Sequence, residues 1–161
     1  MTVKIRPMVA ADKPAVMEML SHTPEFNSRD REVAEEVIDS YLKDPSGSGY
    51  YLLVAEDGSC VAGYVSYGPT PLTESTWDIY WLAVSSKDQR RGVGTALILA
   101  AEKAIKEGGG KLVIIETSST PAYEKARQFY LGRGYEIIAR IPDFYSPGDD
   151  KVIFYKKFDR A

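Results

Sequence analysis

Cysteine and histidine are almost absent from the chain, which has one of each, Cys60 and His22, among 161 residues. One cysteine excludes a disulfide within the chain and is typical of a reducing compartment, so we expect a cytoplasmic protein. One cysteine with one histidine is too small a set for the usual zinc sites, and we expect no metal. We interpret Cys60 as a small core residue of a strand and His22 as a helix end that offsets the helix dipole.

The chain also lacks an excess of positive charge and a long apolar run. Lysine and arginine number 20 against 23 aspartates and glutamates, which gives a net charge of −3 and a pI of about 5.3. This balance provides no general attraction to nucleic acid or to an anionic membrane. No apolar run approaches the length of a membrane span, and the first residues lack the apolar core of a signal peptide. We therefore expect neither nucleic acid nor a membrane as a partner.

What is present is typical of one globular domain. The hydrophobic content is 44% and the charged content 27%. A chain of this length buries roughly two thirds of the surface that its unfolded form exposes. Neither a repeat nor a low-complexity segment divides the sequence, so we predict a single domain over residues 1–161.

Hydrophobic periodicity predicts an alternation of strands and helices that begins with antiparallel hairpins. A strand–helix–strand crossover then occupies the middle of the chain, which favours an α+β fold with a mixed sheet over a doubly wound parallel fold. The polar segment 142–150 is interpreted as a loop between the last two strands. Strands are predicted at 2–7, 50–56, 60–68, 76–84, 111–117, 135–141 and 151–158, and helices at 10–22, 28–43, within 88–110, and at 121–134.

The segment from Asp88 to Gly110, DQRRGVGTALILAAEKAIKEGGG, begins a helix with glycines where better helix formers would be more stable. The first N–H groups of a helix have no partner within the helix and suit an anion such as a pyrophosphate. Gly92 and Gly94 would let a phosphate approach the backbone, and two arginines and Thr95 would add to the binding. For the two glycines alone, turn geometry is the favoured explanation. A dinucleotide fingerprint would need a third glycine where Leu97 stands, and a Walker loop is missing.

The segment resembles the pattern Q/R-x-x-G-x-G/A, filled by Gln89, Gly92 and Gly94. That pattern marks the coenzyme A pyrophosphate loop of the GNAT superfamily of acyl-CoA-dependent N-acetyltransferases. The apolar strand end LAV precedes the loop, and FYLGRGY, which matches F-Y-x-x-x-G-F/Y, follows it. The resemblance covers Trp77 to Tyr135. It implies a three-layer α/β/α arrangement with a mixed, mostly antiparallel sheet whose two parallel central strands splay apart.

The resemblance also implies that acetyl-CoA binds as co-substrate, with its pantetheine arm lying along the strand before the loop. Unpaired backbone amides of a strand edge are a template for such an amide chain. Tyr123 stands where many members have asparagine, so Ser118, Ser119 or the Tyr123 ring would replace the usual side-chain contact. The implied cofactor residues are Leu82, Ala83, Val84, Gln89, Arg90, Arg91, Gly92, Val93, Gly94, Thr95, Ser118, Tyr123 and Phe129.

Tyr130 falls on the family's tyrosine, whose hydroxyl assists the departing thiolate. The ordinary pKa of tyrosine, about 10, is somewhat above that of a thiol, which suits the return of a proton. The alternative is a core tyrosine beside Phe129. The family offset from Tyr130 to Gly134 favours the catalytic role.

An acceptor amine is mostly protonated at neutral pH, so a general base is expected. Asp78 resembles the glutamate base of the histone acetyltransferase branch, and alternation would place residues 78, 80, 82 and 84 on one face of the strand. The alternatives are an ordered water, or Glu74 or Glu116 as the base. Asp78 would then be an exposed carboxylate at a strand entrance.

The acceptor site is expected near Phe26 and near Asp143 and Tyr145 of the segment 142–150, which borders that site in the family. Acids with an aromatic ring suit a cationic amine, although the composition also fits a simple turn. The resemblance predicts acetyl transfer to a primary amine by direct attack in a ternary complex, with a small molecule or amino acid as acceptor. A protein N-terminus or lysine and a non-catalytic acyl-CoA sensor are the alternatives, and homodimers occur among relatives.

Overall fold

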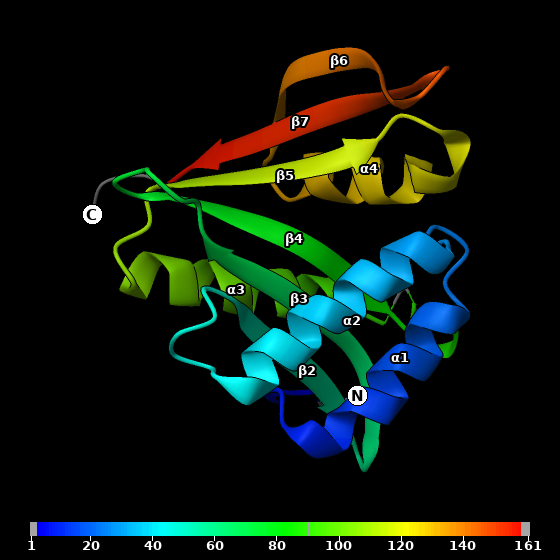
Figure 1. The fold of residues 1–161 in the computed structure, drawn as a ribbon, viewed down its shortest axis with the longest axis vertical. Coiled ribbons are helices and arrows are strands. Elements are labelled where there is room, and N and C mark those ends of the chain that lie inside the picture. The colour runs from blue at the N-terminus through cyan, green and yellow to red at the C-terminus, as the bar shows by residue number, and fades with distance from the viewer. Residues whose placement is uncertain (1–2, 90, 159–161) are drawn as a thin grey trace.

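The computed structural model describes residues 3–89 and 91–158, and their strands form one mixed sheet in the order β1-β2-β3-β4-β5-β7-β6 (Figure 1). The strands are β1 (Lys4–Pro7), β2 (Tyr51–Asp57), β3 (Cys60–Pro69), β4 (Thr76–Val84), β5 (Leu112–Ser118), β6 (Glu136–Ser146) and β7 (Asp149–Lys157). The helices are α1 (Lys13–Ser21), α2 (Ser28–Lys43), α3 (Val93–Glu107) and α4 (Glu124–Gly132), with short 3-10 turns at η1 (Ala10–Asp12), η2 (Ser86–Asp88) and η3 (Pro121–Tyr123).

The pairing of the strands confirms the predicted α+β fold with a mixed, mostly antiparallel sheet. β4 and β5 are the one parallel pair among the described strands, and α3 connects them as the predicted crossover. The other neighbours are antiparallel, and the turn between β2 and β3 has Gly58 at φ 64°, a conformation that favours glycine. No described helix is apolar over a stretch long enough to cross a bilayer.

Helices cover both faces of the sheet, which confirms the three-layer arrangement (Figure 1). On the α3 face, α3 packs against β2, β3 and β4, and side chains of α4, β5 and β7 complete the same apolar core, whose fully buried members include Leu97, Ile98 and Phe154. On the α1–α2 face, side chains of α1 and α2 pack against β2 and β3, with Leu20 and Ile38 fully buried.

The two parallel strands separate after a short contact. Their pairing runs from Thr76 opposite Leu112 to Asp78 opposite Ile114, and no further pair joins them within the described residues. Figure 1 shows β4 and β5 diverging from this point. The predicted splay of the central strands is therefore confirmed, and the edge of β4 that faces β5 has no strand partner beyond Asp78 among the described residues.

A β-bulge in β4 changes the faces to which its side chains point. Ser66 of β3 pairs with Trp81, whereas the next residue of β3 pairs with Ile79, so Tyr80 is an extra residue in the ladder. Ile79 lies in the core of the α3 face and Ala83 in the core of the α1–α2 face. Strict alternation would have put these two residues on the same side.

The expectation that residues 78, 80, 82 and 84 share one face is therefore wrong. Trp77 and Ile79 pack on the α3 face, so Asp78 between them points to the α1–α2 face. Beyond the bulge, Leu82 and Val84 pack against the α3-face core. Thus the α1–α2 face receives Asp78 before the bulge and Trp81 and Ala83 after it, while Leu82 and Val84 point to the other face.

Two further expectations need correction. The segment 142–150 is mostly strand, because β6 continues to Ser146 and β7 begins at Asp149, with a tight turn that has Gly148 at φ 83°. Cys60 is exposed at the first residue of β3 and is not a core residue. His22 lies at the C-cap of α1 as expected, and its ring contacts Glu18 at 2.8 Å.

Candidate active site

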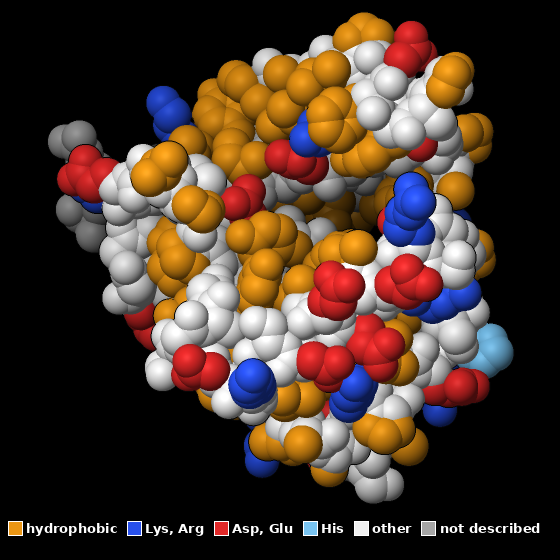
Figure 2. Space-filling model, viewed as in Figure 1, with side chains coloured by type: hydrophobic (Ala, Val, Ile, Leu, Met, Phe, Trp, Pro, Cys, Tyr) orange, Lys and Arg blue, Asp and Glu red, His pale blue; other side chains and the backbone are white. Residues whose placement is uncertain are grey.

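A cavity of about 670 Å³ lies where β4 and β5 separate. Figure 2 shows the surface hollowed there, with acidic side chains near the hollow. The walls come from the loop between α1 and α2, from β4 and β5, from η3 and α4, and from the β6–β7 hairpin. The lining residues are Pro24, Glu25, Phe26, Asn27, Asp30, Asp78, Ile79, Tyr80, Trp81, Leu82, Glu116, Thr117, Ser118, Thr120, Ala122, Tyr123, Tyr130, Tyr145 and Asp149.

The N-terminus of α3 has the features of an anion cradle. Gly92 is its N-cap at φ 81°, and a Cβ added there would meet no atom within 4 Å. The side chain of Val93 is buried in the core, so only its backbone can face a ligand. Thr95 is half-buried and Gln89 is exposed. The first N–H groups of a helix have no partner within the helix, and the space beside Gly92 leaves room for an anion near them. Arg90 lies outside the described residues.

Gly94 brings the loop, the end of β4 and α4 together. A Cβ at this position would lie 3.5 Å from the ring of Phe129 and 3.6 Å from Cγ2 of Val84. These are ordinary van der Waals distances, so Gly94 sits in a narrow gap between the two side chains. The structure therefore places three of the predicted cofactor residues in one neighbourhood.

Asp88 is a structural part of this loop that sequence reasoning missed. Its carboxylate is buried, accepts a short hydrogen bond from Ser85 Oγ and is 3.2 Å from the Arg91 guanidinium. It therefore fixes the entry to α3 and orients Arg91, whose charge it partly offsets. The available signal was an acid three residues before an arginine in DQRR, which is also common in exposed loops.

Tyr130 reaches the cavity from α4. Its ring is buried and makes edge contacts with Phe129, Tyr135 and Phe154, which fix its orientation. Burial raises the pKa of the Tyr130 hydroxyl to about 12. Among the described residues, this hydroxyl has no hydrogen-bond partner, so it is a protonated donor free to serve a ligand in the cavity.

Asp78 lines the same cavity from β4. Thr70 Oγ1 donates to Asp78 Oδ2 at 2.6 Å. Burial is the main cause that raises the pKa of Asp78, and the Glu116 carboxylate raises it further, whereas the hydrogen bond from Thr70 lowers it. Of the two reserve bases, Glu116 lines the cavity and pairs with Lys151 at 2.7 Å, but Glu74 is exposed outside it.

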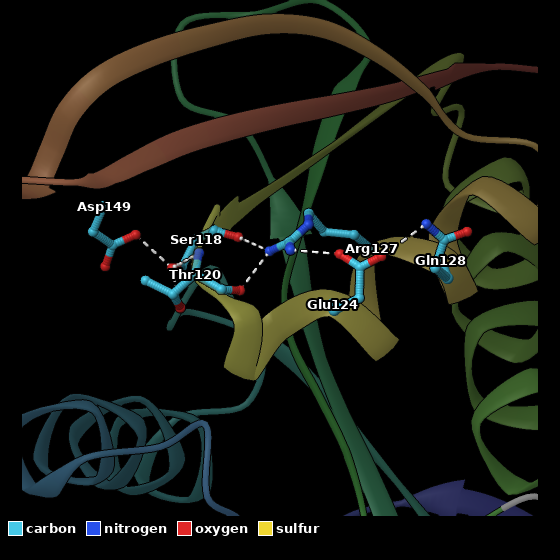
Figure 3. Close-up of polar contacts among 6 residues, drawn as sticks. All are labelled: Ser118, Thr120, Glu124, Arg127, Gln128 and Asp149. Atoms are coloured by element: carbon cyan, nitrogen blue, oxygen red, sulfur yellow. Dashed lines mark hydrogen bonds and ion pairs between the residues drawn. The ribbon is translucent and has the colours of Figure 1, made fainter.

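Ser118 is the hub of a hydrogen-bond network at the end of β5 (Figure 3). Its hydroxyl donates to the carboxylate of Asp149 and contacts Thr120 Oγ1 at 2.9 Å. Arg127 reaches from α4 and donates to the carbonyls of Ser118 and Thr120 at 2.7 and 2.9 Å, while Glu124 binds its other nitrogen at 2.7 Å. The network fixes the wall of the cavity.

Tyr123 bridges two walls of the cavity. Its hydroxyl donates to the carbonyl of Glu25, in the loop between α1 and α2, at 2.7 Å. Burial raises the pKa of Tyr123, and the nearby carboxylates of Asp30 and Glu25 add to the effect. The residue that replaces the family's asparagine therefore uses its hydroxyl within the protein, a role that the sequence did not predict.

The expected acceptor residues divide into two groups. Phe26 and Tyr145 line the cavity. Asp143 does not, because its carboxylate accepts from Gly148 N at 2.7 Å and its φ of 55° belongs to the β6–β7 turn. Sequence reasoning missed Asp30 of α2 and Trp81 of β4 as lining residues, since only the tertiary arrangement brings α2 beside the splayed strands.

Comparisons with known proteins agree with the fold. The acetyltransferase (GNAT) family profile matches residues 13–135. The chain is similar to a GNAT-family protein from Desulfovibrio desulfuricans, at TM-score 0.93 and 35% identity over 97% of this chain and 99% of that one. In fold it is similar to an aminoglycoside 6′-N-acetyltransferase complexed with coenzyme A, at TM-score 0.77 and 19% identity over 98% of this chain and 99% of that one. Rat N-acetyltransferase 8B (Rattus norvegicus) is 33% identical over 104 residues, which are 63% of this chain and 45% of that protein, so the chain spans less than half of that relative.

Proposed function

Because this chain belongs to the GNAT family of acetyltransferases, we propose that it moves the acetyl group of acetyl-CoA to a primary amine of a small molecule, by direct attack in a ternary complex. The observation that carries the proposal is the meeting of Asp78 and Tyr130 in one cavity at the point where β4 and β5 part. A base and a protonated donor that face one space are what amine acylation requires.

The described residues fit coenzyme A on the donor side. The open N–H groups at Gly92 and the first turn of α3 suit the pyrophosphate, and a bulkier residue at Gly92 would occupy that space. The unpaired edge of β4 from Leu82 to Val84 suits the amides of the pantetheine arm. Bound acetyl-CoA supplies the thioester that the amine attacks. We assign an N–H of this strand end, at Val84 or a neighbour, to its carbonyl oxygen.

Asp78 is assigned the role of general base. Its raised pKa makes the carboxylate a better proton acceptor than an exposed aspartate, while Thr70 keeps it oriented. It takes the proton from the acceptor ammonium directly or through one water. Asp78 lies before the bulge at Tyr80 and points to the α1–α2 face, whereas the strand edge assigned to the pantetheine arm, Leu82 to Val84, lies beyond the bulge.

Tyr130 is assigned the role of general acid. With a pKa of about 12 it stays protonated over the whole physiological range and can donate to the leaving thiolate. The edge contacts of its ring with Phe129 and Phe154 hold the hydroxyl in place without using it. The proton that Asp78 removes thus leaves from one wall of the cavity, and the thiolate is protonated from the other.

A small acceptor is favoured over a protein segment because a hydrogen bond joins two walls of the cavity. The bond from Tyr123 to Glu25 O joins η3 to the loop between α1 and α2, both of which line the cavity. An extended peptide would have to pass this bridge, whereas a small amine fits beside it.

The test is thiol release from acetyl-CoA over a panel of small amines and peptides, run beside a calorimetric titration with coenzyme A. We expect binding of coenzyme A and turnover with at least one small amine that exceeds turnover with peptides. Binding without turnover on any amine would identify a non-catalytic acyl-CoA sensor instead, and the absence of binding would contradict both the donor and the catalytic assignments.

A further inference from the structure

The charge of the cavity goes beyond what one acceptor amine requires. Five acids line it, and the described residues of the lining include no lysine, arginine or histidine. The acids are Glu25, Asp30, Asp78, Glu116 and Asp149. The cavity is already assigned to an amine on the separate grounds of family and of the two catalytic groups, so the acids are part of a site that must hold a ligand.

Most of this negative charge has no cation beside it. Glu116 alone of the five is ion-paired among the described residues, with Lys151 at 2.7 Å. Asp149 accepts from the Ser118 hydroxyl, Asp78 from the Thr70 hydroxyl, and Asp30 from the backbone N–H of Asn27. These donors are neutral. Four carboxylates around one cavity repel each other unless a bound cation compensates them.

The carboxylates are spread along the cavity, since Asp78 lies opposite Ile114 of β5 and Asp149 binds Ser118, four residues further along that strand. Asp78 and Glu116 lie near the fork of β4 and β5, whereas Asp30 belongs to α2 and Asp149 to β7. Both of the latter face Tyr145, whose pKa rises to about 12 through burial and then through Glu116, Asp149 and Asp30. No group of three described acidic, histidine or cysteine residues is close enough to hold one metal ion. Charge distributed in this way suits a long cation better than a point charge.

The apolar part of the lining fits the same shape. Tyr80 and Trp81 from β4, Phe26 from the α1–α2 loop and Tyr145 from the hairpin line the same cavity with aromatic rings. Aromatic rings pack against methylene chains and attract ammonium groups. The amine that is acetylated must lose its proton beside Asp78, so it cannot compensate the distant acids.

We propose that the acceptor is a linear amine with at least two amino groups, a diamine or polyamine, whose second ammonium binds between Asp30 and Asp149 while the first is acetylated near Asp78. This inference rests on the proposed function and specifies its acceptor. The second ammonium keeps its charge throughout, so the acetylated product differs from the substrate only at the end beside Asp78.

A matched set of six-carbon acceptors tests the proposal on the wild-type protein. We would compare kcat/KM for 1,6-diaminohexane, n-hexylamine, 6-amino-1-hexanol and 6-aminohexanoate. After correction for its two equivalent ends, the diamine should exceed n-hexylamine and the alcohol by about 10-fold or more, the effect of one charge-assisted hydrogen bond, and 6-aminohexanoate should be the poorest. Equal values for the diamine and n-hexylamine would overturn the proposal.

Variants locate the second ammonium. Asp30→Asn and Asp149→Asn should each reduce the ratio of diamine to n-hexylamine by about 10-fold. Asparagine keeps an oxygen for the bond to Asn27 N at 3.1 Å, so Asp30→Asn preserves the cap of α2. Glu36→Gln, an equal loss of charge on the exposed side of α2, should leave the ratio unchanged. An unchanged ratio in both cavity variants would refute the assignment.

Binding separates this inference from the proposed function. The rise in melting temperature caused by the diamine, relative to n-hexylamine, is measured in the presence of coenzyme A, without turnover. A larger rise with the diamine supports the acceptor class even if no amine is acetylated. No difference in melting temperature, together with turnover of some other amine, would leave the acetyltransferase in place and reject the diamine.

Discussion

Thr70 Oγ1 donates to Asp78 Oδ2 at 2.6 Å, and this bond opposes the burial that raises the pKa of Asp78. Thr70→Val should therefore raise that pKa further. Because the base acts when it is deprotonated, kcat/KM rises with pH through the pKa of Asp78. In the Thr70→Val variant, this rise of kcat/KM should therefore occur at higher pH. A pH–rate profile measures the shift.

Glu116→Gln removes a charge that raises the pKa of Asp78, so the rise of kcat/KM should occur at lower pH in this variant. Movement of the two pH–rate profiles in the same direction would contradict the assignment of Asp78 as the base.

Tyr130→Phe should lower kcat by about 100-fold, the lower range for loss of a general acid, with little change in the affinity for coenzyme A. The hydroxyl has no partner among the described residues, so its removal leaves no protein group unpaired and should not reduce the melting temperature. Stopped assays under saturating acetyl-CoA, with calorimetric titration of coenzyme A, give the two readouts. A variant with full turnover would remove Tyr130 from the mechanism.

Gly92→Ala should weaken coenzyme A binding by about 10-fold or more, because the new Cβ enters the space left open at the start of α3. The left-handed backbone at φ 81° will also cost about 1 kcal/mol of stability. Gly58→Ala is the matched control, since Gly58 has φ 64° and an equally open side in the β2–β3 turn. Equal affinities for coenzyme A in the two variants would show that the weaker binding comes from backbone strain and not from loss of the anion cradle.

Asp12→Asn should destabilise the protein by about 1–2 kcal/mol at pH 7, because Asp12 is buried and accepts two hydrogen bonds of 2.8 Å from Arg6. Arg6 holds the pKa of Asp12 below its ordinary value. The stability from this pair is therefore present above about pH 4 and is lost as the pH falls through the folded-state pKa.

Urea unfolding of wild type and Asp12→Asn between pH 7 and pH 3 measures both effects. The difference in unfolding free energy should shrink toward the acid end of the range. Asp39→Asn, which breaks the exposed pair with Lys13 at 2.6 Å, is the control and should have the smaller effect. A constant difference across the range would show that Asp12 stabilises the fold by packing rather than by charge.

The order of the strands and helices could be predicted because each of them has a recognisable local sequence pattern. Strand 76–84 is dense in aromatic and β-branched residues, and the apolar residues of 93–107 recur at helical spacing. The segment 142–150 misled the prediction, because its proline, glycine and aspartates are typical of loops. Pairing with β7 extends β6 through this segment, and Asp143 at φ 55° takes up a turn. Pairing between strands is not visible in the composition of one of them.

Local motifs pointed to several residues that line the cavity, such as Asp78 and Tyr130, but not to the contacts between distant segments. Gly92 and Gly94 are neighbours in sequence, so their loop is recognisable as a unit. The bridge from Tyr123 to Glu25 joins residues 98 positions apart, and the contribution of Asp30 depends on how α2 lies across the sheet. Such contacts follow from packing of whole layers, which a local pattern does not encode.

The extra residue at Tyr80 has a consequence for how the protein can vary. It separates two stretches of regular alternation, and on the proposed function Asp78 of the first stretch serves the acceptor while the backbone from Leu82 to Val84 in the second serves the donor. Substitutions on one side of the bulge can then alter the affinity for one ligand and leave the affinity for the other unchanged. Deletion of Tyr80 would remove the bulge and make Ile79 and Trp81 consecutive, so that β4 would alternate without interruption while its other side chains kept their present faces.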